Sequence, residues 1–209
     1  PAYLISKTCK RTASGGFIVA VPRKAKSAAT LIALGADQIH MGLMSELGPV
    51  DPQIGGGIPA LGTANGLEVL ASLVTKYPEA SNLFSKYLGE TLNLHLLGYF
   101  QRLNESSVQY AARLLEGKKI PSGRTVEGLS DHFVNHYKDH SFVIDIDEAK
   151  KLLGENVIKV NSTEYACVNH MYKVLNLCET LCSIVWKMHI SFVGNITKGF
   201  TLTQVPETE

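Results

Sequence analysis

The chain has 209 residues, with 20 lysine and arginine against 19 aspartate and glutamate side chains, for a formal net charge of +1. This length is sufficient for one large domain with a buried core. The near-neutral charge argues against binding of nucleic acid or anionic lipid through a strong overall field, so we expect no nucleic-acid partner.

The cysteine pattern indicates a reducing compartment, and the hydropathy pattern indicates a chain without a membrane-spanning segment. The four cysteines are irregularly spaced, unlike a disulfide-rich secreted domain or a zinc knuckle. No apolar run is long enough to span a bilayer, and the first residues lack the order of a signal peptide. We therefore expect a cytoplasmic protein, with membrane association only through a region that is not in this chain.

In the first quarter of the chain, the order of expected strands and helices is typical of an α/β domain with a parallel sheet. The expected elements are a helix at 2–11, a strand at 17–21, a helix at 27–34 and a strand at 38–41. Ser27 is a plausible N-cap of the second helix and Gly35 a plausible end. Residues 48–57 then form a loop with two prolines and three consecutive glycines.

The middle and end of the chain are predominantly helical in pattern. Residues 67–115 show helical periodicity broken at Pro78 and Gly89, which predicts two or three helices outside the sheet. A connector at 117–124 leads to a helix from 126 to about 137, a surface helix at 147–153 and a closing strand at 157–160. Residues 163–188 predict a long amphipathic helix, whose apolar face packs either on the core or on another subunit.

Ser27 stands where a serine could act as a nucleophile. A serine hydroxyl needs a base to take its proton and backbone N–H groups to receive the developing oxyanion. A helix that begins directly after a strand supplies unpaired N–H groups at its positive end, and the N–H of Ala28 is one of them. On the residues alone, an ordinary serine N-cap without chemistry is the better explanation of the position, because serine is a preferred cap in general.

Two segments resemble the serine dehydrogenase proteinase family, relatives of signal peptide peptidase SppA in the ClpP/crotonase superfamily. The first contains V-P-R at 21–23, S-A-A-T at 27–30, A-D-Q-I at 36–39 and S-E-L-G-P-V-D-P-Q at 45–53. The second is HSFVIDIDEAKKLLGENV at 140–157. The helical stretch between these segments and the residues after 160 match nothing in the family pattern.

The resemblance implies a ClpP/crotonase-like spiral of ββα units, here an α/β fold with added outer helices. It assigns residues 1–160 to this domain, with 64–138 mostly helical, and leaves 161–209 as a C-terminal helical extension. It implies a hydrolase that cleaves peptide bonds through an acyl-enzyme, with the nucleophile at Ser27 and the first oxyanion donor at the N–H of Ala28. It also implies peptide or unfolded protein substrates and assembly into a homo-oligomer.

The chain departs from the family pattern in two places. Ala29 replaces a glycine of the family's S-A-G motif. The family also has a strand and a Gly-Gly turn before the first helix, and this turn supplies the second oxyanion donor. The chain begins within that helix, so we expect either a fragment of a longer protein or an oxyanion hole that lacks one donor.

The general base has several candidates. The histidine position of a ClpP triad falls at 50–52, where no histidine stands. We rank His140 first, because the family pattern shares it and imidazole titrates near neutral pH; His136 is an alternative and Asp51 a possible orienting acid. A Ser/Lys dyad would instead use Lys86 or Lys76, whose simpler interpretation is a solvated lysine on a helix.

The sequence therefore predicts a serine endopeptidase without a metal or cofactor. His132, His136 and His140 are spaced by four but lack the carboxylate of a typical metal motif, and the glycine loop lacks the residues of a phosphate loop. Two other functions remain open. One is an inactive subunit of an assembly, and the other is a crotonase-like enzyme acting on acyl thioesters.

Overall fold

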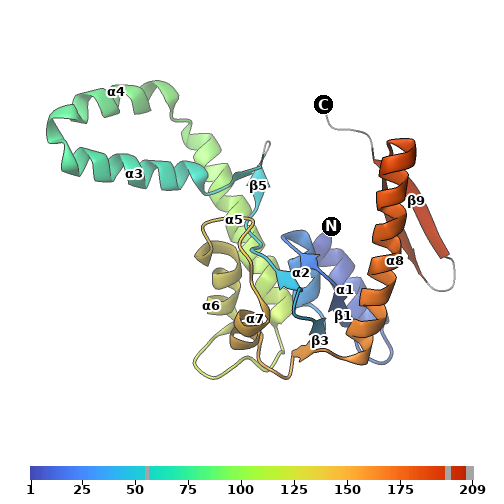
Figure 1. Ribbon diagram of the computed structural model, residues 1–209. Helices are drawn as coiled ribbons and strands as arrows, with labels where there is room; N and C mark the ends of the chain where they lie inside the picture. The colour runs from blue at the N-terminus through green and yellow to red at the C-terminus, as the bar shows by residue number, and fades with distance from the viewer. Residues whose placement is uncertain (55–56, 196–198, 206–209) are drawn as a thin grey trace.

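The computed structural model describes residues 1–54, 57–195 and 199–205, and it has a mixed α/β fold with small sheets (Figure 1). Two glycines of the glycine loop, Gly55 and Gly56, lie outside the described residues. The α/β class expected from the sequence is confirmed.

A three-stranded parallel sheet lies at the centre of the body. It consists of β1 (Ile18–Val21), β3 (Gln38–Met41) and β7 (Ile158–Val160), in the order β1-β3-β7. Helix α2 (Ala28–Leu34) connects the first two strands, which confirms the predicted strand–helix–strand unit. A second parallel pair consists of β2 (Lys24–Ala25), which lies between β1 and α2 in the sequence, and β4 (Glu46–Leu47), which follows β3.

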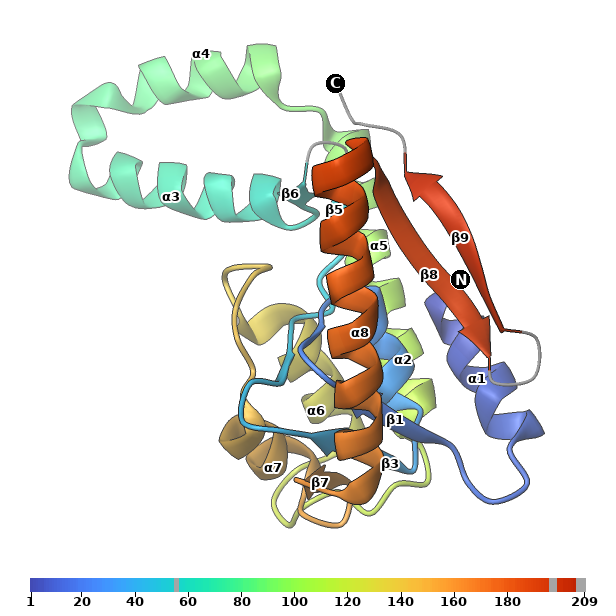
Figure 2. The same ribbon diagram turned by 45° about the vertical axis from the view of Figure 1, so that its right-hand side comes forward.

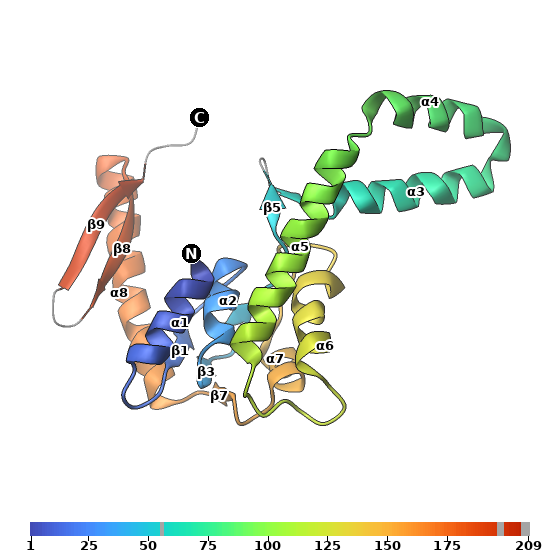
Figure 3. The same cartoon turned by 180° about the vertical axis from the view of Figure 1, so that it is seen from behind.

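Helices cover both sides of the central sheet. Helices α1 (Ala2–Thr12) and α5 (Leu94–Leu115) pack against α2. Helix α8 (Thr163–Trp186) contacts β1 and β3 and, in Figure 2, crosses in front of these strands with α2 behind them. The view from behind shows α1, α2 and α5 on the near side (Figure 3). The segment that contains Ser27 therefore lies between a sheet and a helical layer.

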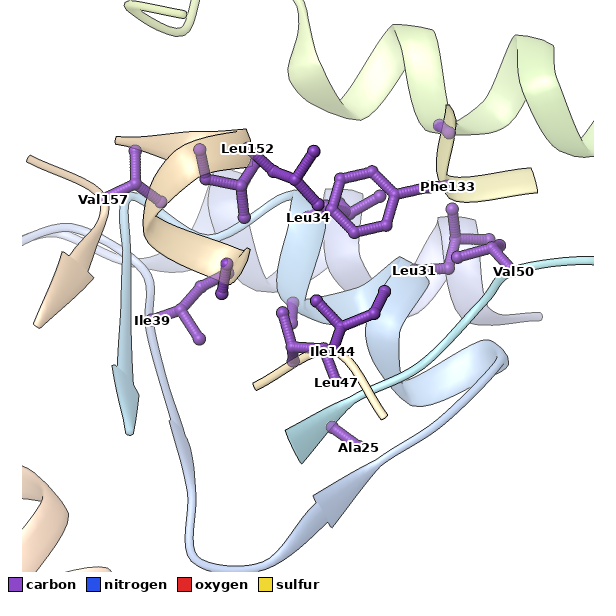
Figure 4. Close-up of a cluster of buried hydrophobic side chains, with 14 of the residues drawn as sticks. Ala25, Leu31, Leu34, Ile39, Leu47, Val50, Phe133, Ile144, Leu152 and Val157 are labelled. Atoms are coloured by element: carbon purple, nitrogen blue, oxygen red, sulfur yellow. The ribbon is translucent and has the colours of Figure 1, made fainter. Parts of the chain in front are cut away.

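One hydrophobic core joins the first and last parts of the domain (Figure 4). Leu34 of α2, Ile39 of β3, Leu47 of β4 and Ile144 are fully buried in it. The backbones of Leu47 and Ile144 exchange two hydrogen bonds, at 2.9 and 3.1 Å, so segments about 100 residues apart in the sequence are held together.

A helical arm projects from the body (Figure 1). It follows a small hairpin of β5 (Gln53–Ile54) and β6 (Ile58–Pro59), and consists of α3 (Gly62–Lys76), a short 3-10 helix η1 (Pro78–Ala80) and α4 (Ser81–Thr91). The predicted break at Pro78 is confirmed, because proline cannot donate the backbone hydrogen bond of a continuing helix. The predicted break at Gly89 is wrong: this residue lies within α4, and glycine costs a helix only about 1 kcal/mol.

The second half of the domain agrees with the expected helices and strand. After α5 come α6 (Val126–Asp131), a single π-helical turn η2 (His132–His136) and α7 (Ile146–Leu153). The expected surface helix at 147–153 is amphipathic, since Leu152 and Leu153 are buried in the core. The predicted closing strand corresponds to β7.

The C-terminal extension is helical only in its first part. After α8 the chain forms an antiparallel hairpin of β8 (His189–Asn195) and β9 (Gly199–Val205), which the sequence pattern did not predict. Helix α8 has no buried residue and exposes one apolar side; we call this side the α8 outer face. It consists of Met171, Val174, Leu177, Leu181, Ile184 and Val185. No helix in the described part of the chain is both long and apolar enough to cross a membrane.

Candidate functional site

Ser27 has a backbone conformation that serine rarely adopts. Its φ of 51° and ψ of −114° are close to the first central position of a type II′ turn, which glycine normally occupies. A non-glycine residue held in such a sparsely populated backbone conformation lowers the stability of the fold by about 1–3 kcal/mol, and it persists only where the surrounding structure enforces it. The conformation turns the chain sharply from β2 into α2, as at the nucleophile of hydrolases in which a serine sits on a strained strand-to-helix turn.

The side chain of Ser27 does not cap the helix that it precedes. The hydroxyl accepts no hydrogen bond from the first turn of α2, and among the described residues it has no hydrogen-bond partner at all. Ordinary caps occur elsewhere in the chain, where a side-chain oxygen accepts from a first-turn N–H at Asn93, Thr125, Asp145 and Ser162. Capping therefore does not explain the serine at this position.

Tertiary hydrogen bonds fix the turn around Ser27. The N–H of Ser27 donates to the carbonyl of Pro49 at 3.1 Å. The buried hydroxyl of Thr30 donates to the carbonyl of Ala25 at 2.5 Å and accepts from the N–H of Gly48 at 3.0 Å. The turn is therefore locked to the 48–51 segment, which contains Asp51. The N–H of Ala28, the first residue of α2, has no carbonyl one turn earlier within the helix and remains a possible oxyanion donor.

A cavity of about 400 Å³ lies beside the serine. It is lined by Ser27, Ala28 and Leu31 of the α2 segment together with Val50, Asp51 and Pro52. Residues of α1 and α5 also line it, and among them the rings of Tyr3 and Tyr110 lie 4.9 Å apart. The walls are mostly apolar, as is typical of sites for small molecules or single side chains.

His140 and Asp51, which the sequence proposed as base and orienting acid, form a close pair. The Nδ1 of His140 lies 2.7 Å from Oδ1 of Asp51, and the two side chains are 32% and 14% exposed. A carboxylate at Nδ1 favours the tautomer that carries its proton on Nδ1 and leaves a lone pair on Nε2. Nε2 can then accept a proton, while Asp51 keeps its place in the wall of the Ser27 cavity.

Local sequence gives the turn that presents His140. Asp139 accepts hydrogen bonds from the N–H of Ser141 at 2.9 Å and from its hydroxyl at 2.8 Å, while the N–H of Phe142 donates to the Asp139 carbonyl at 3.0 Å. The backbone N–H of Ser141 is the main cause of a lowered pKa at Asp139, which stays ionised and keeps this turn.

Lys26 and Tyr137 hold the His140 turn against the domain. The ammonium of Lys26 donates to the carbonyls of Phe142 at 2.7 Å and Ser141 at 3.2 Å, and lies 3.4 Å from the carboxylate of Glu46. The ring of Phe142 stacks on Tyr137 with centroids 4.6 Å apart. Burial, followed by the hydrogen bond to Glu148, raises the pKa of Tyr137, so its hydroxyl remains a donor.

The other candidate bases lie elsewhere. Lys76 ends α3 and Lys86 lies within α4, so both belong to the arm that projects away from α2 (Figure 1). Lys76 is placed over the ring of Tyr77, at 5.3 Å from its centroid. His136 stacks on His132 at 4.0 Å, and burial lowers the pKa of His132. Within one chain, the structure brings neither lysine to Ser27. In the described residues, no group of three or more His, Cys, Asp or Glu side chains is arranged to hold a metal ion.

Sequence reasoning assigned no role to Lys26 or to the two tyrosines of the cavity. Lys26 contacts residues 115 and 116 positions later, and Tyr3 meets Tyr110 across two helices. No local spacing indicates such contacts. The adjacency of Lys26 to Ser27 was the one available signal.

A scan against protein-family models, a search of curated proteins and a search of solved structures each found no match to this chain. A functional assignment therefore depends on the geometry and chemistry of the site around Ser27.

Proposed function

We propose that this chain is a serine peptidase of the ClpP/crotonase type that cleaves peptide bonds through an acyl-enzyme on Ser27. The observation that supports this most strongly is the backbone of Ser27, which is held in a glycine-like conformation at the entry to α2 while its hydroxyl caps nothing. A strained residue of this kind, beside a cavity, is typical of an active site.

In the proposed reaction, Ser27 attacks the carbonyl carbon of a bound peptide. The hydroxyl proton passes to Nε2 of His140, while Asp51 stabilises the resulting imidazolium from Nδ1. The N–H of Ala28 donates to the oxygen that becomes negative. Collapse of the tetrahedral intermediate breaks the C–N bond, and His140 returns the proton to the leaving amine. In the second half of the reaction, His140 takes a proton from a water molecule whose oxygen attacks the acyl carbon. The bond between this carbon and the Ser27 oxygen then breaks, and His140 returns the proton to Ser27.

The contact between Ser27 and His140 forms, in this proposal, when substrate is bound. The Ser27 hydroxyl makes no hydrogen bond with any residue that the structure describes, and catalytic hydrogen bonds are often long or poorly aligned before substrate binds. The shared segment 49–51 supports their proximity, since Pro49 accepts from Ser27 and Asp51 pairs with His140.

We further propose that the protein acts as a homo-oligomer. The α8 outer face exposes six large apolar side chains along one helix, and contiguous apolar surface of this kind is typical of subunit contacts. The same face also supports the second candidate, a catalytically inactive subunit whose role is assembly.

Fluorophosphonate labelling separates these functions, because only an activated serine reacts. We expect the wild-type chain to be labelled and Ser27→Ala to lose the label. Ser107 is the matched control: it lines the same cavity, but its hydroxyl donates to the Leu103 carbonyl of its own helix at 3.2 Å. The Ser107→Ala variant should label as the wild type does. Absence of labelling in the folded wild-type protein would favour the assembly subunit.

A further inference from the structure

One side chain links the segment of the proposed nucleophile to the segment of the proposed base. Lys26 directly precedes Ser27 in the sequence. Its ammonium donates to the carbonyl oxygens of Ser141 at 3.2 Å and Phe142 at 2.7 Å. These are the two residues that follow His140. The residue before the serine is therefore bonded to the residues after the histidine.

Further oxygens keep the ammonium of Lys26 in this place. It lies 3.4 Å from the carbonyl oxygen of Leu47 and 3.4 Å from the carboxylate of Glu46. The side chains of Lys26 and Glu46 are only 23% and 15% exposed. Polar contacts between partly desolvated groups are stronger than those on the open surface. The link is consequently a defined contact of the fold, unlike a solvated surface lysine.

Gly48 leaves space for the path of the Lys26 side chain. A Cβ atom at position 48 would lie 2.3 Å from Cδ of Lys26, in the middle of that side chain, and 3.4 Å from its Cα. Carbon atoms that are not bonded to each other do not approach to 2.3 Å, so any other residue at position 48 would displace the lysine. A glycine in such a place is typical of a close approach to the backbone.

Little apolar contact holds the turn that follows His140. Phe142 and Val143 are 42% and 51% exposed, and the next fully buried residue is Ile144. The backbone of Ile144 is paired with that of Leu47, so the chain is fixed from this point onwards without Lys26. Before this point, polar contacts such as those of the Lys26 ammonium carry most of the attachment.

We propose that Lys26 is a positioning residue, which sets the distance between the Ser27 hydroxyl and the imidazole of His140. The inference rests on the proposed peptidase function and names a further residue on which its rate depends. Lys26 acts by holding the base where it can take the proton of the serine. A displacement of about 1 Å in such a placement can reduce a rate about a hundredfold.

Fluorophosphonate labelling of Lys26→Met tests this role, since methionine keeps an unbranched apolar side chain but has no ammonium. We expect the second-order labelling rate of Ser27 to fall about tenfold to a hundredfold. Lys26→Arg keeps the charge and N–H donors, so it should label faster than Lys26→Met. Lys24→Met is the matched control, because Lys24 lies 3.9 Å from the same carboxylate of Glu46 but is 76% exposed. Its rate should stay within about twofold of the wild-type rate.

A double-mutant cycle separates positioning from a general structural role. If Lys26 acts through His140, Lys26→Met should change the labelling rate of a His140→Gln protein by less than about twofold. Equal losses in both backgrounds, or an unchanged rate in Lys26→Met alone, would overturn the proposal and leave the peptidase function intact. A folded wild-type protein that is not labelled would refute the peptidase function and the positioning role together.

Amide hydrogen exchange measures the turn without any reaction at Ser27. The pairing of Leu47 with Ile144 does not involve the ammonium, so we expect Lys26→Met to fold. In this variant the N–H groups of Ser141 and Phe142 should exchange faster, whereas the N–H of Leu47 should exchange as in the wild type. Unchanged exchange at residues 141 and 142 would show that the turn keeps its place without Lys26, and would overturn the proposal.

Discussion

Replacement of Ser27 by glycine should stabilise the protein while abolishing its activity. Glycine adopts the φ of 51° and ψ of −114° without a steric penalty, which releases about 1–3 kcal/mol of backbone strain. The greater freedom of glycine in the unfolded chain offsets about 0.4–1 kcal/mol of this gain. Because the Ser27 hydroxyl caps no N–H of α2, removing it lowers the free energy of unfolding only slightly. The net expectation is an increase of about 0.5–2 kcal/mol in the free energy of unfolding.

Urea unfolding measures this difference directly. With a slope of about 1–3 kcal/mol per molar urea, a gain of 1 kcal/mol raises the midpoint by about 0.3–1 M. Thr125 is the matched control, since it precedes α6 with an ordinary φ of −109° and its side chain accepts from the N–H of Gly128. There, glycine should lower stability by a few tenths of a kcal/mol. A Ser27→Gly protein less stable than wild type would refute the strained-nucleophile argument.

Three further predictions concern the base, a buried lysine and the oligomer. His140→Gln should slow fluorophosphonate labelling of the folded protein by about 10²–10⁴-fold and Asp51→Asn should also slow it, whereas unchanged rates would remove this pair from the mechanism. Burial lowers the pKa of Lys118 to about 8. Between pH 8 and about 10.5 the folded state therefore binds fewer protons than the unfolded state, so the free energy of unfolding should rise with pH in this window. Urea titrations of Lys118→Met should show a flatter rise. Leu181→Glu on the α8 outer face should reduce the mass seen by light scattering, while Asn176→Glu, at an exposed position on another side of α8, should not. A monomeric wild type would contradict the homo-oligomer.

The elements nearest Ser27 were predictable because their signals are local. The short apolar run at 17–21, the short strand expected at 38–41 and the small-residue helix between them appear as β1, β3 and α2. The two breaks expected in the helical region differ for a chemical reason: Pro78 removes a hydrogen-bond donor, whereas Gly89 only lowers helix propensity and is tolerated inside α4. The hairpin at β8 and β9 was missed although residues 189–192 alternate between polar and apolar, which is a recognised strand signal.

By itself, the sequence determined which side chains could do chemistry here: a serine at a strand-to-helix junction, a histidine and an aspartate. Tertiary structure alone decided that Ser27 is strained and does not cap its helix, because distant partners at Ala25, Gly48 and Pro49 lock the turn through hydrogen bonds. It also decided that His140 meets Asp51, 89 positions away. Such contacts depend on how the core folds the chain back on itself, and no local spacing of residues encodes that path.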